Sequence, residues 1–373
     1  MSFKNKARQI RNNLYCLPWK ILNNLGLYKN SNVPIKYVSE RANWAIKNFG
    51  QNLKRELDII APNKITISTD PSRCINQLVH FGSQYMWLNW ESNISRNNIF
   101  ISTFFHGKPS DGEEMKIHID KFLKSTSKLD KVITASSLIE KRLLDWGIDS
   151  KKLIKIPIGV NTNIFNYAKK SQKKEIRKLL NIPEESIVIG SFQKDGVGWG
   201  NGLEPKLIKG PDIFISTLKK LVNRGLPIFA LITGPARGYV IQNLEKNNIP
   251  YYHSYVREVD ELVPLYKALD LYLITSREEG GPMGLLESTS CGIPVISTNV
   301  GMAKDVIKDG LTGYICNEYE SSLIADKTEL FLKNIYKEKN NNLQKNIRKE
   351  TLKFDWKEVA KLHWQKVYSP LIK

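Results

Sequence analysis

The sequence predicts an α/β protein built from two doubly wound parallel-sheet domains. Its 373 residues correspond to two domains at roughly 150 residues each. Hydrophobic residues make up 41% of the chain and charged residues 25%, which is typical of a globular protein with a core. Short β-branched segments alternate with segments whose apolar residues have helical spacing. This alternation is typical of a parallel sheet with helices on both faces.

The alternation is clearest in the second half of the chain. Strands are predicted at residues 186–192, 228–233, 271–275 and 295–297. Helices are predicted at residues 211–224, 259–269 and 282–291. The first of these helices begins with proline and carries its apolar residues on one face. In such sheets, ligands bind beyond the carboxyl ends of the strands.

The first half of the chain is less regular. It predicts strands at 77–81, 99–104 and 131–135 and a helix at 138–146. The polar, lysine-rich residues 168–178 are interpreted as a linker between domains that runs into a short helix. Asp355 as N-cap and Glu358 as its capping-box partner predict a final helix at 356–368. We therefore expect domains at 1–167 and 168–352, with a C-terminal helix at 353–373 that packs back on the first domain.

Positive charge is the unusual bulk feature of the sequence. Lys and Arg number 56 against 37 Asp and Glu, a formal net charge of +19. Such an excess attracts nucleic acid, an anionic membrane surface or phosphate-bearing substrates. Residues 1–30 form a basic amphipathic segment that contains Trp19 and could lie in a lipid interface. The alternative is a solvated helix packed on the edge of the domain. The basic residues of this segment are Lys4, Lys6, Arg8, Arg11, Lys20 and Lys29.

Several classes of protein do not fit the sequence. It contains no apolar run of the ~18 residues that a membrane-spanning helix needs, and no apolar region that would make its basic start a secretory signal. Four scattered cysteines indicate a reducing compartment, so we expect a cytoplasmic protein. A peripheral position on the inner face of the membrane is the alternative. There is no D-x-D triplet and no metal-ligand spacing, and the glycines at 196–202 do not form G-x-G-x-x-G. We therefore expect no metal, no cofactor and no nucleic-acid partner.

Residues 276–292 carry the most informative pattern. A strand ends in the turn Gly280-Gly281-Pro282, and the backbone N–H groups of Gly280 and Gly281 can approach an anion closely at the start of the following helix. Glu279 lies in the turn, and Glu287 lies about a turn and a half into the helix. Two carboxylates beside one phosphate site suit the ribose, diphosphate and hexose of a nucleotide sugar. The alternative is a strand–turn–helix with two solvated glutamates.

The E-x7-E spacing of Glu279 and Glu287, with the C-G-I-P-V-I-S-T-N-V-G run after it, resembles retaining glycosyltransferases of family 4, also called glycosyl transferases group 1. The resemblance implies the GT-B fold, two facing Rossmann-like domains with the donor held mainly by the second. It implies that Glu287 binds the ribose hydroxyls and that Glu279 contacts the donor sugar. The loop of Gly280, Gly281, Pro282, Met283 and Gly284 would then hold sugar and phosphate through its amides, with Pro282 contributing no N–H.

Three lysines and one histidine extend the resemblance. Lys194 and Lys209 resemble a basic pair that neutralises the departing diphosphate, and Lys206 could replace either. The F-F-H-G segment that contains His106 resembles a histidine loop at a strand end that faces the donor sugar. His80 is a weaker candidate for a histidine in the same cleft. For each of these residues the alternative is a solvated lysine or a structural histidine.

The resemblance implies transfer of a sugar from a UDP-, GDP- or ADP-sugar to a hydroxyl of a glycan or lipid-linked acceptor. It implies retention at the anomeric carbon, with the leaving phosphate accepting the proton, in cell-surface glycan or glycolipid synthesis. Two enzymatic alternatives are a phosphorylase and a sugar-nucleotide epimerase. A catalytically silent polyanion-binding protein is the alternative from another class.

Overall fold

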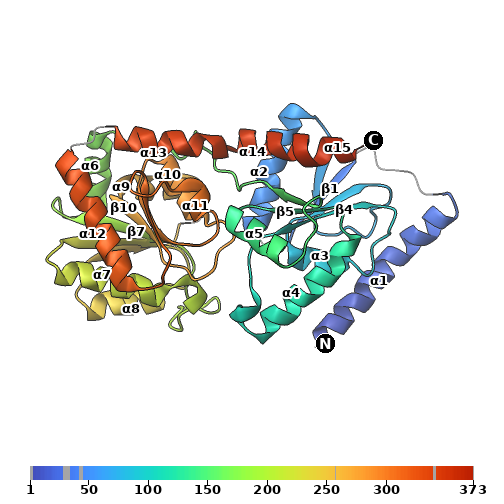
Figure 1. The fold of residues 1–373 in the computed structure, drawn as a ribbon, viewed down its shortest axis with the longest axis horizontal. Coiled ribbons are helices and arrows are strands. Elements are labelled where there is room, and N and C mark those ends of the chain that lie inside the picture. Colours follow the sequence, from blue (N-terminus) through green and yellow to red (C-terminus); the bar gives the residue numbers. More distant parts are fainter. Residues whose placement is uncertain (1–2, 28–33, 42–44, 257, 339–341, 373) are drawn as a thin grey trace. The chain divides into compact units, whose positions relative to one another are not determined.

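The computed structural model describes residues 3–27, 34–41, 45–256, 258–338 and 342–372. Its contacts divide the chain into two compact units, one of Met1–Gly159 with Trp356–Lys373 and one of Val160–Asp355 (Figure 1). Within the described residues each unit contains a six-stranded sheet, and neighbouring strands in both sheets are parallel. The predicted fold class is therefore confirmed. Residues 160–167, which we expected at the end of the first domain, belong to the second unit.

The first unit has the strand order β2-β1-β3-β4-β5-β6. Its strands are β1 (Ile35–Val38), β2 (Ile65–Ser68), β3 (Leu78–Phe81), β4 (Ile99–Phe104), β5 (Lys131–Thr134) and β6 (Leu153–Lys155). Its α-helices are α1 (Phe3–Asn24), α2 (Ala45–Ile60), α3 (Gln84–Trp90), α4 (Glu113–Ser125), α5 (Ser137–Asp145), α14 (Trp356–His363) and α15 (Ser369–Leu371).

The final helix belongs to the first unit because aromatic packing holds it there. Trp356 packs edge-to-face on Phe49 of α2, with ring centroids 5.0 Å apart. Gly159 makes room for this indole, since a Cβ at that position would lie 2.4 Å from a ring carbon of Trp356. The α-helix predicted at 356–368 is regular only to His363, and one π-helical turn (Trp364–Tyr368) follows it.

The second unit has the strand order β12-β11-β10-β7-β8-β9. Its strands are β7 (Ile187–Phe192), β8 (Ile228–Thr233), β9 (Tyr251–Ser254), β10 (Leu271–Ile274), β11 (Val295–Thr298) and β12 (Gly313–Cys316). Its α-helices are α6 (Lys170–Leu179), α7 (Pro211–Asn223), α8 (Gly238–Lys246), α9 (Val259–Ala268), α10 (Met283–Ser290), α11 (Ala303–Val306), α12 (Ser321–Glu338) and α13 (Leu343–Thr351). The first strand, β7, lies between β8 and β10, so the order of strand addition reverses there.

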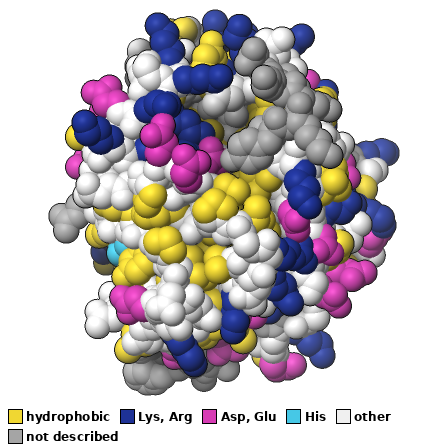
Figure 2. All heavy atoms as spheres, turned by 90° about the vertical axis from the view of Figure 1, so that its left-hand side faces the viewer, with side chains coloured by type: hydrophobic (Ala, Val, Ile, Leu, Met, Phe, Trp, Pro, Cys, Tyr) yellow, Lys and Arg dark blue, Asp and Glu magenta, His cyan; other side chains and the backbone are white. Residues whose placement is uncertain are grey.

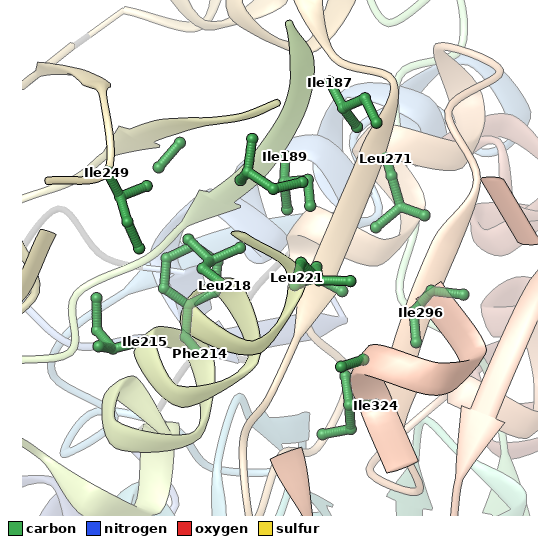
Figure 3. Close-up of a cluster of buried hydrophobic side chains, with 14 of the residues drawn as sticks. Ile187, Ile189, Phe214, Ile215, Leu218, Leu221, Ile249, Leu271, Ile296 and Ile324 are labelled. Atoms are coloured by element: carbon green, nitrogen blue, oxygen red, sulfur yellow. The ribbon is translucent and has the colours of Figure 1, made fainter. Parts of the chain in front are cut away.

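Apolar side chains between this sheet and its helices form the core of the second unit. Figure 3 shows side chains from the strands beside those of α7, among them Phe214 and Leu218. Both of these side chains are fully buried. Each strand and helix that the sequence predicts in this unit begins and ends within one residue of its observed bounds. Strong β-branched runs and helical periodicity account for that agreement.

Residues 168–178, predicted as a linker that runs into a short helix, mostly form α6, which packs on the second unit. Asp270 accepts hydrogen bonds from Lys173 Nζ at 2.8 Å and from Arg177 Nη2 at 2.6 Å. Nearby positive charge holds the pKa of this carboxyl below its ordinary value, against the opposing effect of burial. Its polar, lysine-rich composition is typical of a solvated linker. In the structure, however, Lys173 and Arg177 pair with a carboxylate more than 90 residues away in sequence.

The surface of the second unit mixes both signs of charge. On the face shown in Figure 2, hydrophobic side chains form a central band, with Lys, Arg, Asp and Glu around it. On this face the positive excess is therefore not gathered into one basic surface. No helix among the described residues has both the length and the hydrophobicity that crossing a bilayer requires.

Candidate functional site

The candidate site lies at the carboxyl ends of β7 and β10. These strands are neighbours in the sheet but distant in sequence, because the chain builds β8 and β9 on one side of β7 before it adds β10 on the other. Such a reversal leaves space beyond the strand ends where ligands bind in open α/β sheets. The loop after β7 carries Lys194, Lys206 and Lys209, and the loop after β10 carries Glu279.

A glycine brings these two loops into contact. Gly210 has a left-handed backbone, with φ of 65°, and a Cβ there would lie 1.8 Å from the carbonyl oxygen of Thr275. The hydroxyl of Thr275 donates a 2.8 Å hydrogen bond to the carbonyl of Gly210. Only glycine permits both the conformation and the close approach. Lys209 is therefore held directly over the end of β10.

An ion pair reinforces the same contact. The Arg277 guanidinium donates two hydrogen bonds, of 2.8 and 2.6 Å, to the carboxylate of Asp212 in the first turn of α7. This two-point geometry fixes orientation as well as distance. The sequence analysis missed this pair, because its members are 65 residues apart.

Two of the predicted site residues meet directly. Lys209 Nζ lies 2.6 Å from Glu279 Oε1, and the hydroxyl of Ser276 donates a 2.9 Å hydrogen bond to the same oxygen. The Lys209 side chain is 26% exposed and that of Glu279 is 10% exposed, so the pair can reach a ligand while the carboxylate stays held. The structure thus brings together a cation and an anion that the sequence assigned to one site.

The other two lysines lie near Lys209. Partial desolvation, together with the positive charges of Lys209 and Lys194, lowers the pKa of Lys206. Lys194 Nζ lies 3.6 Å from the ring centroid of Trp199, a cation–π contact. Three positive charges therefore converge beyond the end of β7, an arrangement that favours an anion with several oxygens.

The insertion at 196–204 forms a hairpin. Gly196 pairs with Pro205 in an antiparallel bridge, and the amide of Val197 donates a 2.9 Å hydrogen bond to the carbonyl of Glu204. Gly202 packs so tightly on Ala236 that a Cβ would lie 2.1 Å from its carbonyl oxygen. The hairpin presents Trp199 to Lys194, a contact that the sequence analysis did not foresee.

The turn at 280–284 leads into α10, with Pro282 at the N-cap and Met283 as the first helical residue. Gly301 backs this turn, since a Cβ there would lie 2.9 Å from the carbonyl carbon of Gly280 and 3.0 Å from the nitrogen of Gly281. Gly284 permits close packing of α10 on the sheet, because a Cβ would lie 2.3 Å from the hydroxyl of Tyr272. The N-terminus of α10 is thus fixed against β10, the neighbour of β7 in the sheet.

Glu287 is partly buried in α10 and bonded to a tyrosine. The hydroxyl of Tyr266, in α9, donates a 2.7 Å hydrogen bond to Glu287 Oε2. Burial raises the pKa of the carboxyl from 4.5 to about 7, and the hydrogen bond from Tyr266 opposes that rise. The group can therefore change its charge near neutral pH.

A buried ion pair that the sequence analysis missed supports the lysine loop. Arg237 Nε lies 3.1 Å from Asp195 Oδ1, and the two side chains are 0% and 1% exposed. Arg237 Nη1 also donates to the carbonyls of Ser191 at 2.7 Å and Gln193 at 3.0 Å. The pair therefore holds the backbone on both sides of Phe192, immediately before Lys194. The only sequence signal was an arginine in the G-P-A-R-G turn after a buried strand.

The two histidine candidates lie in the first unit. His106 follows β4, and its carbonyl accepts a 3.0 Å hydrogen bond from the side-chain amide of Gln84; its proposed role toward the donor stays a prediction. His80 is fully buried, with hydrogen bonds to Tyr368 at 2.6 Å and Thr103 at 2.8 Å. The expectation of a site role for His80 is wrong, because the π-helical turn covers it.

The described residues contain no group of three or more His, Cys, Asp and Glu side chains placed to hold a metal ion. Independence of metal stays a prediction.

Comparison with known families agrees with this geometry. The family described as "Glycosyl transferases group 1" matches residues 202–350, a range that includes Lys206, Lys209, Glu279 and Glu287. The match starts inside the hairpin and covers most of the second unit.

Curated relatives and solved structures extend the comparison. The chain is 32% identical over 100 residues to the N-acetyl-alpha-D-glucosaminyl L-malate synthase of Bacillus anthracis, covering 27% of this chain and 26% of that protein. It is 26% identical over 249 residues to the sulfoquinovosyl transferase SQD2 of Arabidopsis thaliana, covering 65% and 45%. The chain thus spans about half or less of the length of these relatives.

Two solved structures share the fold. Alr3699/HepE of Anabaena, in complex with UDP-glucose, superposes with a TM-score of 0.72 at 15% identity, over 90% of this chain and 99% of that one. The sucrose-phosphate synthase of Thermosynechococcus elongatus gives 0.71 at 17% identity, over 91% and 99%. The two parallel sheets with their helices have the GT-B fold, which these two structures share.

The buried pair behind the lysine loop predicts a large effect on stability. Arg237→Met leaves the Asp195 carboxylate buried without its cation, which should lower the free energy of unfolding by about 3–5 kcal/mol. Adding Asp195→Asn should recover part of this loss. Urea unfolding monitored by circular dichroism measures both. The control is Arg224→Met, which removes exposed ion pairs with Asp326 and Glu329 and should cost no more than about 1 kcal/mol. Equal effects for Arg237 and Arg224 would contradict the assignment.

The raised pKa of Glu287 predicts a pH dependence of stability. Between pH 4.5 and about 7 the folded chain keeps a proton that the unfolded chain loses, so stability falls as pH rises through this range. The loss attributable to this group is about 3 kcal/mol. Glu287→Gln keeps the shape of the side chain and should remove this component in urea titrations at pH 5 and pH 8. Glu185→Gln, at an exposed position of the same unit, is the control, and an unchanged slope in Glu287→Gln would refute the prediction.

Proposed function

We propose that this protein is a glycosyltransferase that moves a sugar from a nucleoside-diphosphate sugar to an acceptor hydroxyl with retention. One observation carries the proposal: Lys209 and Glu279 form a 2.6 Å ion pair at the reversal point of the second sheet. The pair lies in a glycosyl transferases group 1 domain. It offers a cation for a phosphate and a carboxylate for a sugar within one contact.

The diphosphate would lie among the lysines and the N-terminus of α10. Lys209, with Lys194 or Lys206, supplies positive charge, and the amides after Gly280 supply hydrogen-bond donors and the positive end of the helix dipole. Lys194 must exchange its contact with Trp199 for a phosphate oxygen in order to take part. Glu287 would accept hydrogen bonds from the two ribose hydroxyls, in place of or beside that from Tyr266.

The chemistry proposed for this site needs no enzymatic nucleophile. The bond between the anomeric carbon and the diphosphate oxygen breaks, and the acceptor oxygen bonds to the same face of that carbon. The acceptor proton passes to the departing phosphate oxygen. Lys209 stabilises the charge that develops on this oxygen, which is usually a large catalytic effect. Glu279, held by Ser276, would orient the donor sugar.

We propose a UDP-, GDP- or ADP-sugar as donor and a glycan or lipid-linked molecule as acceptor, in synthesis of a cell-surface glycan or glycolipid. His106 of the first unit would contact the donor sugar or help to position the acceptor. The proposed location is the cytoplasm, and the four free, buried cysteine thiols suit a reducing compartment.

The donor site predicts a graded loss of activity. A panel of UDP-, GDP- and ADP-sugars, assayed by release of the nucleoside diphosphate, should identify one preferred donor. With that donor, Lys209→Ala should lower kcat/KM by about 30- to 1,000-fold, corresponding to about 2–4 kcal/mol of transition-state stabilisation. Lys219→Ala, at an exposed position of α7, the helix that follows Lys209, should leave kcat/KM unchanged.

Three results would count against the proposal. Near-normal kcat/KM in Lys209→Ala would remove the lysine from the site. Release of a sugar phosphate only when inorganic phosphate is added would indicate a phosphorylase. Salt-sensitive binding of nucleic acid with no turnover of any donor would favour a polyanion-binding protein.

The lysines and helix amides also predict that the reaction is independent of metal. They supply the positive charge that a divalent cation would otherwise bring to the diphosphate. Turnover of the preferred donor in excess EDTA should therefore equal the turnover without it. Loss of activity in EDTA that Mg²⁺ or Mn²⁺ restores would show that the lysines alone are insufficient.

A further inference from the structure

Helix α1 exposes a stripe of large apolar side chains, which we call the α1 stripe. It consists of Ile10, Leu14, Leu17 and Ile21, which are 62%, 63%, 52% and 49% exposed. At 3.6 residues per turn, these four positions fall within an arc of roughly 60° on one face of the helix. Leu25 and Leu27, just beyond the helix, are also exposed, at 64% and 67%.

The opposite face of α1 holds the helix on the first unit. Asn12 and Cys16 are each 1% exposed, and the side-chain amide of Asn12 donates a 2.8 Å hydrogen bond to the carbonyl of Asn89. The guanidinium of Arg73 lies 4.6 Å from the ring centroid of Trp19. A surface helix usually buries its apolar face, whereas α1 packs through small and polar side chains and leaves the α1 stripe uncovered.

Arg11 and Lys20 lie on either side of the α1 stripe, each about 90° from its centre on the helix. Residues 1–39 contain seven Lys and Arg and no Asp or Glu. Of these, Lys29 and the side chains of Lys4, Lys6 and Arg8 lie outside the described part of the chain.

Beside α1 and α3, which are neighbours in Figure 1, a hollow of about 850 Å³ is lined in part by Gln9 of α1. Its charged lining residues are Lys121, Lys124, Lys128, Glu91 and Glu114.

We propose that α1 docks the first unit on an anionic lipid bilayer, with the α1 stripe in the interface and the basic residues against the headgroups. An amphipathic helix with these two features binds membranes through buried apolar area and through attraction to anionic lipid. A second copy of the chain fits less well, because pairing α1 with α1 would bring together two segments of positive charge. The inference rests on α1 alone and does not depend on the proposed transferase activity.

Sedimentation of the full chain with lipid vesicles tests the proposal. Vesicles of phosphatidylcholine with phosphatidylglycerol should bind the chain about ten-fold or more tightly than phosphatidylcholine alone, and high salt should reduce this difference. The double variant Leu14→Glu/Leu17→Glu should lose most of the binding. The matched control Ile59→Glu/Leu179→Glu makes the same change in charge at two positions that are each 76% exposed, on α2 and α6, and should bind like the wild type.

Two further measurements keep the outcomes distinct. Circular dichroism and release of nucleoside diphosphate without vesicles should be unchanged in the α1 double variant, so failure of docking and failure of the proposed function are separable. Equal binding to both vesicle types, no binding to either, or equal losses in the two double variants would overturn the proposal. So would a dimer of the wild-type chain that Leu14→Glu/Leu17→Glu converts to a monomer without an effect on vesicle binding.

Discussion

The close approach of Gly210 to Thr275 is the constraint on which the candidate site depends. A side chain at position 210 would collide with the end of β10, so the loop after β7 could not cross it. Lys209 would then lose its position over Glu279, 70 residues further along the chain. The bidentate pair of Arg277 and Asp212 holds the same crossing in one orientation. The absence of a Cβ at Gly210 therefore allows the loop after β7, which carries Lys209, to contact the loop after β10, which carries Glu279.

The site contains one ion pair at the surface and a second ion pair buried behind it. At the surface of the second unit, Lys209 and Glu279 pair where a ligand can replace either partner, and Lys194 and Lys206 lie near enough to affect one another. Behind them, Arg237 and Asp195 are fully buried and hold the backbone that precedes Lys194. In the proposed function the outer charges bind the donor, and the inner pair positions the loop that carries them. A buried pair suits that second role because its removal leaves an uncompensated charge, which makes the loop geometry costly to change.

Local sequence was enough to predict a large part of this architecture. Hydrophobic periodicity located the strands and helices of the second half, and the Gly-Gly-Pro turn located the start of α10, because both signals are carried by consecutive residues. Local signals failed where the decisive partner is remote. Asp270 holds α6 on the second unit and the hydroxyl of Tyr368 lies against the ring of buried His80, and no local pattern indicates either contact.

The sequence by itself determined the fold class and the spacing of Glu279 and Glu287. It also indicated which lysines are predicted to bind a diphosphate. Only the tertiary structure decided which of these groups touch. The order of the strands places β7 beside β10, so Lys209 meets Glu279, whereas Glu287 turns to Tyr266 and becomes a carboxyl that titrates near neutral pH. The physical reason is that charge and pKa depend on neighbours in space, and in this chain those neighbours are tens of residues apart in sequence.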